Sequence, residues 1–326
     1  MIGRRAFLRT VSAGLLAVPL AAEALQTGTV PRLGILSPAS PSAFGYAFDA
    51  LRQGLRDLGY VEGQNLIIEW RWAEGKYERL PALAADLVRL NVDCIVTHGV
   101  ARRVAKEATA TIPIVMASGG NPVAEGLVAS LARPDGNLTG VSFALSEVAA
   151  RRLEMLKEAV PSVSRVALLF NPGSATAFGG IEALERSARG LNLTLQPLAV
   201  RAPGEIEGAL SAMTPRQGDA LALIEDWVII VNARRVAEQA MKRRLSSVGF
   251  LEWAEAGGLL AYDADIVTVY NRAAAYVDKI LKGAKPRDLP IEQTTKFKLI
   301  VNLNTANALG LTMPPSLLRR ADQVIE

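Results

Sequence analysis

A buried strand, a loop of small residues and a helix signal follow one another in residues 111–128, TIPIVMASGGNPVAEGLV. The apolar run 112–116 predicts the strand, 117–122 the loop, and the residues from Val123 onward the helix. This succession is typical of open parallel sheets, where backbone N–H groups and small side chains meet a ligand at the carboxyl ends of the strands. A similar succession occurs at 165–180, RVALLFNPGSATAFGG. We therefore expect two α/β halves with a cleft between them.

The rest of the chain repeats the alternation of strand and helix signals. In the first half, strands are expected at 32–37, 66–70, 92–97, 112–116 and 138–142, and helices at 43–58, 77–90, 101–110 and 123–131. In the second half, strands are expected at 166–170, 193–197, 220–224, 247–250, 259–262 and 298–302, and helices at 146–160, 175–189, 205–213, 232–243, 266–281 and 305–309. This pattern predicts two doubly wound parallel-sheet lobes that meet near residues 142–146.

The N-terminus has the features of an export signal. Arg4 and Arg5 precede an apolar stretch at 11–22, and the triplet Ala22-Glu23-Ala24 is a small-x-small cleavage site. The apolar stretch is too short to span a membrane. The Arg-Arg-x-Phe-Leu order is similar to signals of the twin-arginine route, with an ordinary Sec signal as the alternative. We expect residues 1–26 to lie outside the fold, cleavage near Ala24, and a periplasmic protein.

Composition and motifs argue against several classes of function. A net charge of +4 in 326 residues, partly due to the export signal, is too weak and too scattered for a nucleic-acid surface. Cys94 is the single cysteine, so no intrachain disulfide is possible, and it lies in an apolar run and is expected in the core. Neither a dinucleotide fingerprint nor a P-loop follows the strands, and one histidine does not make a zinc site. We therefore expect no cofactor and no metal.

A catalytic function finds little support among these residues. The nearest match to a nucleophile elbow, Gly140-Val141-Ser142-Phe143-Ala144, lacks its second glycine. A Ser–His–acid triad would need His98, the only histidine, which is expected at a strand end with no elbow serine. We expect a binding protein that is not an enzyme, with a hydrolase as the distant alternative.

Polar and aromatic side chains follow the predicted strands, where a parallel sheet gathers its ligand-binding loops. Hydroxyls and helix N-termini suit a carboxylate, whereas acidic and aromatic side chains suit an amine or a ring, so an α-amino acid would satisfy both. Each residue also has a structural alternative, as a helix cap or, for Trp227 and Trp253, as a cover of the core. The candidates are Ser37, Thr97, His98, Ser118 and Asn121 in the first half, and Asn171, Glu225, Asp226, Trp227, Glu252 and Asp263 in the second.

Four segments together resemble a known family. These are TIPIVMASGGNPVAEGLVASLARPDGNLTGVS, RVALLFNPGS, KILKGAKPRDLPIE and KLIVNLNTANALGL, and the likeness extends over about residues 31–315. They resemble ABC-transporter substrate-binding proteins of the tryptophan/tyrosine-binding type. The resemblance implies a type I periplasmic-binding-protein fold, whose two lobes are joined by three crossovers and close on a ligand. It implies a first lobe of 31–143 plus the helix at 264–283, and a second lobe of 144–262 plus 290–326.

The family's ligand-facing positions fall on the candidates above, except His98 and Trp227. The family often has Asp at position 121, Thr-Asp-Asn at 225–227 and a Gly-Asp loop at 251–253, so the resemblance transfers the fold but not the ligand. It implies a monomer that binds a small molecule 1:1 without turnover and delivers it to an ABC permease in the inner membrane. A module that presents its ligand to a signalling receptor is the alternative.

Overall fold

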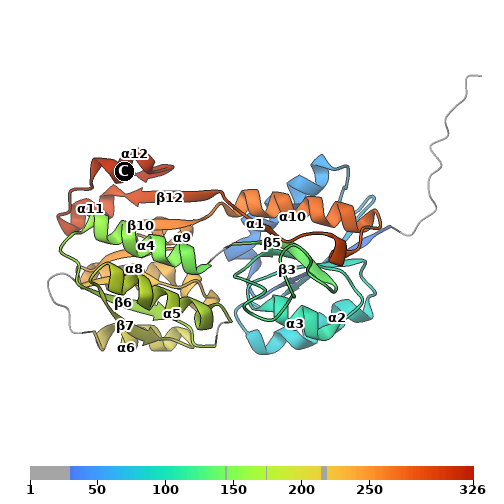
Figure 1. The fold of residues 1–326 in the computed structure, drawn as a ribbon, viewed down its shortest axis with the longest axis horizontal. Coiled ribbons are helices and arrows are strands. Elements are labelled where there is room, and N and C mark those ends of the chain that lie inside the picture. The colour runs from blue at the N-terminus through green and yellow to red at the C-terminus, as the bar shows by residue number, and fades with distance from the viewer. Residues whose placement is uncertain (1–29, 144, 174, 214–218) are drawn as a thin grey trace, which may run out of the picture. The chain divides into compact units, whose positions relative to one another are not determined.

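Two sheets, each covered by helices on both faces, form the described part of the protein (Figure 1). The computed structural model describes residues 30–143, 145–173, 175–213 and 219–326. The expected export signal and its cleavage site therefore lie outside the described residues. Within the described residues, no helix is both long and apolar enough to cross a membrane.

The first sheet is parallel, with strand order β11-β5-β4-β3-β1-β2. One face is covered by α1 and α10 and the other by α2 and α3 (Figure 1), and each face has its own apolar core. The strands are β1 (Arg32–Ser37), β2 (Ile67–Trp72), β3 (Cys94–His98), β4 (Ile114–Ser118), β5 (Leu138–Ser142) and β11 (Glu292–Gln293); the helices are α1 (Pro41–Asp57), α2 (Leu80–Arg89), α3 (Ala101–Ala108) and α10 (Ile266–Leu281).

The second sheet has the order β13-β12-β10-β9-β8-β6-β7 and is parallel except that β12 runs antiparallel to β10. Two apolar cores again lie on its two faces. Its strands are β6 (Arg165–Phe170), β7 (Thr194–Ala199), β8 (Asp219–Leu223), β9 (Ser246–Gly249), β10 (Leu260–Ala264), β12 (Phe297–Asn302) and β13 (Gln323–Ile325). Its helices are α4 (Leu145–Ala159), α5 (Ala175–Gly190), α6 (Ile206–Ser211), α7 (Trp227–Ile230), α8 (Ala233–Lys242), α9 (Leu251–Glu255), α11 (Leu303–Leu309) and α12 (Pro315–Arg320).

The chain passes between the sheets three times, after β5, after β10 and after β11. The second passage brings α10 onto α1. The two helices can approach closely because Gly54 has no side chain: an added Cβ there would lie only 2.8 Å from Ala274 Cβ. The predicted fold of two α/β lobes is thereby confirmed. The lobe boundaries remain predictions, with one local difference: Glu292–Gln293 pairs with β5, so these residues belong to the first sheet and not to the second lobe.

One predicted helix is wrong. Residues 123–131 form turns, because Gly126 adopts the left-handed φ of +69° and interrupts any helix. The side chain of Asn121 accepts the N–H groups of Val123 and Ala124 and so closes the first turn locally. Conversely, α7, α9, α12, β11 and β13 were not predicted, because each is too short for periodicity to show.

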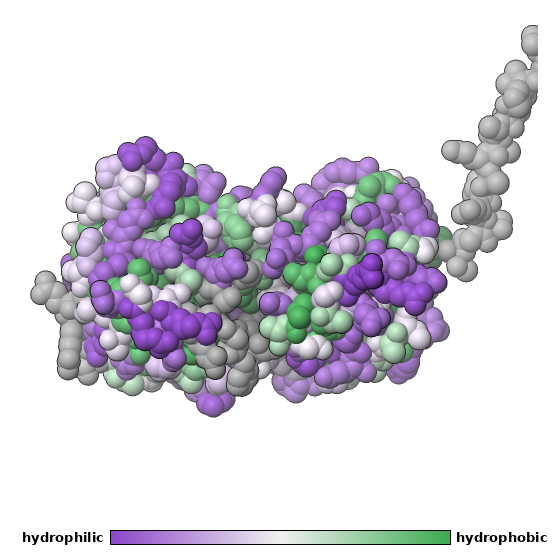
Figure 2. Space-filling model, viewed as in Figure 1, coloured by the Kyte–Doolittle hydropathy of each residue, from purple (hydrophilic) through white to green (hydrophobic). Residues whose placement is uncertain are grey.

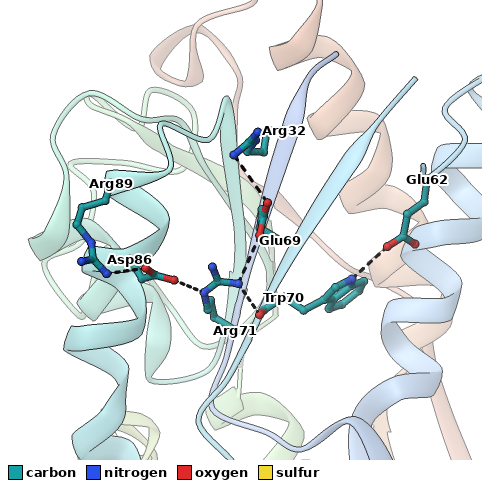
Figure 3. A network of polar contacts seen from close by, with 7 residues as sticks. All are labelled: Arg32, Glu62, Glu69, Trp70, Arg71, Asp86 and Arg89. Atoms are coloured by element: carbon teal, nitrogen blue, oxygen red, sulfur yellow. Dashed lines mark hydrogen bonds and ion pairs between the residues drawn. The ribbon is translucent and has the colours of Figure 1, made fainter. Parts of the chain in front are cut away.

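The outer edge of the first sheet, β2, carries charges on one face and indole rings on the other. A chain of ion pairs runs from Arg32 through Glu69, Arg71 and Asp86 to Arg89, whereas Trp70 points to the opposite side and donates to Glu62 (Figure 3). Such charges keep an edge strand from pairing with another chain. The surface drawn in Figure 2 is mainly hydrophilic, with hydrophobic residues in small separate groups.

Candidate functional site

A cavity of about 100 Å³ lies where the carboxyl ends of strands from both sheets meet. This volume has room for more than one water molecule and so for a small organic ligand. Seven of the predicted site residues line it: His98, Ser118, Glu225, Asp226, Trp227, Glu252 and Asp263. The arrangement agrees with the rule that ligands of parallel sheets bind beyond the carboxyl ends of the strands.

Four predicted site residues do not line the cavity. Ser37 and Asn171 lie one hydrogen bond behind it, because they contact His98 and Asp226 respectively. Thr97 is fully buried, and its hydroxyl has no partner within the part of the chain that the structure describes. Asn121 is exposed and serves as the turn cap described above. The ligand contact expected of Asn121 stays a prediction.

Tyr77 of the first lobe forms hydrogen bonds with the second-lobe loop at 225–227, which is called the acidic loop below. Its hydroxyl donates to Asp226 Oδ2 at 2.9 Å and accepts the backbone N–H of Trp227 at 3.2 Å. The other carboxylate oxygen of Asp226 accepts from Asn171 Nδ2 and from the Val228 N–H, and the latter contact caps α7. Burial and the neighbouring Asp226 carboxylate raise the pKa of Tyr77, so its hydroxyl remains a donor.

A second hydrogen bond joins the lobes at Glu252, which also lines the cavity. Tyr46, on α1, donates to Glu252 Oε1 on α9 at 2.5 Å. Burial, followed by the charge of Glu252, raises the pKa of Tyr46. Two tyrosine hydroxyls of the first lobe thus donate to two carboxyl groups of the second.

Arg152 lies behind the acidic wall of the cavity. Its guanidinium is 2% exposed, pairs with Glu225 and lies 3.2 Å from Asp263 Oδ2. It also donates to the backbone carbonyls of Tyr262 at 2.7 Å and Leu223 at 3.3 Å. Burial, the charge of Glu225 and the weaker opposing effect of Arg152 leave the pKa of Asp263 well above its usual value. Arg152 thus positions two of the cavity's carboxyl groups.

A buried arginine also supports the first-lobe side of the cavity. Arg102 donates to the Gly99 carbonyl at 2.8 Å and pairs with Glu125 at 3.0 Å, so it ties together the loops after β3 and β4. Gly119, which lines the cavity, has φ +151°, and a Cβ there would lie 2.3 Å from Arg102 Cζ. Only glycine fits at this position without displacing the guanidinium.

Aromatic rings form much of the remaining wall. Phe44 stacks on His98 with ring centroids 4.7 Å apart and meets Trp227 edge to face at 5.4 Å. The rings of Phe143 and Phe250 also line the cavity. Trp253 does not line the cavity: its ring is fully buried against Gly249 and Gly258, so it is a core residue, as the structural alternative had it.

The geometry around His98 does not support hydrolysis. Ser37 Oγ lies 2.9 Å from His98 Nε2, but this hydroxyl is fully buried and accepts the Ala39 N–H. Burial, helped by Arg102, lowers the pKa of His98 to about 3. An imidazole with so low a pKa is a weak base at neutral pH, and the serine has no surface for substrate to approach.

Sequence reasoning missed Tyr77, Tyr46, Phe44, Arg102 and Arg152. All five lie on helices or turns and not at strand ends, where the candidates were sought. The sequence signal was weak and concerned the two arginines, each of which lies on the buried face of a predicted helix.

The comparisons with known proteins agree with this architecture. A family model described as ABC transporter substrate binding protein matches residues 32–325. The chain therefore belongs to the family of ABC transporter substrate-binding proteins. Its relatives in this family include a tyrosine-binding protein of Clostridioides difficile (strain R20291), which is 25% identical over 261 residues that cover 79% of this chain and 75% of that protein.

Two solved structures share the fold over 91% of this chain and 100% of their own length. One is a conserved domain protein from Vibrio cholerae, with a TM-score of 0.86 and 26% identity. The other is an ABC domain from Streptococcus pneumonia in complex with L-Trp, with a TM-score of 0.85 and 26% identity.

Proposed function

We propose that this protein is the extracytoplasmic solute-binding component of an ABC importer and captures an amino acid or a related small amine between its two lobes. The observation that carries the proposal is the cavity itself, whose wall combines Ser118 and Gly119 of the first lobe with Glu225, Glu252 and Asp263 of the second. A ligand that contacts both lobes stabilises the closed form by the contacts it makes only there.

The two sides of the cavity suit opposite ends of an α-amino acid. The hydroxyl of Ser118 and the loops at Gly99 and Gly119 face a carboxylate, while the acidic wall faces an amine. The named ligands of two relatives, tyrosine and L-Trp, support an amino acid. We further propose a periplasmic monomer that is exported by the N-terminal signal and delivers its ligand to an inner-membrane permease. The alternative, presentation of the ligand to a signalling receptor, uses the same cavity.

Native mass spectrometry of the protein purified without refolding tests this function. We expect a fraction of molecules to carry one small amine-containing compound, which is released by unfolding and identified in the supernatant. The released compound should rebind 1:1 and raise the midpoint of thermal unfolding, because it binds the folded state alone. A protein that carries no ligand, and that no amino acid stabilises, would contradict the proposed function.

A further inference from the structure

The charges around the cavity are unbalanced. Four carboxyl groups line it, those of Glu225, Asp226, Glu252 and Asp263, and all come from the second lobe. No lysine or arginine lines it within the described ranges, and Arg152, which lies behind the wall, pairs with Glu225 and Asp263. Asp226 and Glu252 each accept a hydrogen bond from a neutral tyrosine hydroxyl and form no ion pair with another described residue.

Trp227 provides a second, independent observation. Its side chain lines the same cavity and is 5% exposed, yet its indole Nε1 has no acceptor among the described residues. An unsatisfied buried donor costs free energy, so a hydrogen-bond acceptor on the ligand is the expected partner. The rings of Trp227, Phe44 and Tyr77 also offer faces and edges beside the acidic wall, a surrounding that attracts organic cations.

We propose that the cavity selects a ligand with net positive charge, a basic amino acid or a comparable amine with an amidinium-like or ammonium group, over neutral amino acids. The cationic group lies against Glu252 and Asp263, and an acceptor such as the ligand's carboxylate faces Trp227 and Ser118. This inference rests on the proposed function, because it names the substrate class of the same cavity. It also gives a role to the acidic 225–227 loop, at which this chain departs from the family pattern described above.

The acidic wall also makes binding proton-linked. Burial raises the pKa of Glu252, with the charges of Glu255 and Glu225 acting in the same direction and Tyr46 opposing it. The pKa of Asp263 is raised as described above, with Glu225, Arg152 and Glu252 as its charged neighbours. Lys298, opposite Asp263 in the sheet register, pairs with Asp265 at 3.2 Å. A bound cation favours the ionised carboxylates, so its binding releases protons and tightens as pH rises.

Calorimetric titration with L-arginine and L-citrulline tests the proposal, since the two have nearly the same shape and differ in charge. We expect arginine to bind at least about tenfold more tightly than citrulline at pH 7.5. Its binding should release protons, which a comparison of binding enthalpies in two buffers detects, and its affinity should fall at pH 5. Glu252→Gln, which keeps the acceptor for Tyr46, should remove most of this preference. Glu255→Gln removes the same charge from the same helix outside this cavity and should preserve it.

The results distinguish a failure of this proposal from a failure of the proposed amino-acid-binding function. Citrulline, L-Trp or L-Tyr binding as tightly as arginine, or arginine affinity that does not change with pH, would overturn the charge selection and leave the amino-acid-binding function standing. If none of the four binds and the purified protein carries no ligand, the proposed function fails and this inference fails with it.

Discussion

Replacement of Arg152 by methionine is expected to lower the free energy of unfolding by about 3–5 kcal/mol, because it leaves buried carboxyl groups without their counter-charge. The guanidinium is the shared partner of Glu225 and Asp263, and it also donates to the backbone carbonyls of Leu223 and Tyr262 in β8 and β10. Methionine keeps the apolar stem but none of these contacts. Ligand binding should weaken as well, since both carboxyl groups line the cavity.

The cost of Arg152→Met should depend on pH in a defined direction. The pKa of Asp263 is already raised in the folded protein, and loss of Arg152 raises it further. Consider a carboxyl group whose pKa is higher in the folded than in the unfolded protein. Its contribution to stability is complete below its pKa in the unfolded protein, and this contribution is lost as the pH rises through its pKa in the folded protein. The difference in the free energy of unfolding between wild type and Arg152→Met, measured by urea unfolding, should therefore grow from pH 5 to pH 8.

A neighbouring arginine provides the matched control. Arg151 is largely exposed and pairs with Glu154 one turn away, so Arg151→Met should change stability by no more than about 0.5 kcal/mol. Equal losses for the two variants, or an Arg152→Met deficit that shrinks as pH rises, would show that Arg152 does not compensate the buried carboxyl groups.

The second large effect is expected at Gly140, where alanine should lower the free energy of unfolding by about 3 kcal/mol. Gly140 has φ +129°, and an added Cβ would lie 2.2 Å from the Met116 carbonyl oxygen. Backbone cannot move aside as a flexible side chain can, so β4 and β5 must separate. This strand pair supports Gly119, whose carbonyl accepts the Phe143 N–H at 3.0 Å, and the cavity rim should loosen with it.

Gly45 is the control for this substitution. It lies within α1, and an added Cβ there meets no atom within 4 Å. Gly45→Ala should therefore stabilise the protein by about 0.5–1 kcal/mol, because alanine loses less backbone entropy in a helix. Chemical unfolding of both variants checks the pair. A Gly140→Ala protein as stable as wild type would show that the β4–β5 approach is wrong.

The sequence predicted the strands, the longer helices and the edge at which ligand-binding loops gather, because these depend on local periodicity. The turn cap at Asn121 could not be told from a ligand contact in the sequence, because the same side chain suits both roles. The core position of Trp253 was only one of its alternatives in the sequence, because burial depends on the glycines that pack around the ring in the folded chain. Tyr77 and Arg152 could not be found, since their partners lie 149 and 73 residues away along the chain. Long-range pairings of this kind exist only once the two lobes are assembled.

A crystal structure of the protein with its co-purified ligand tests the central claim most directly. The account predicts one ligand molecule in the cavity, with its amine near Glu252 and Asp263, its acceptor near Ser118 and Trp227, and Tyr77 bonded to Asp226 across it. A ligand bound elsewhere on either lobe, with this cavity holding only water, would contradict it.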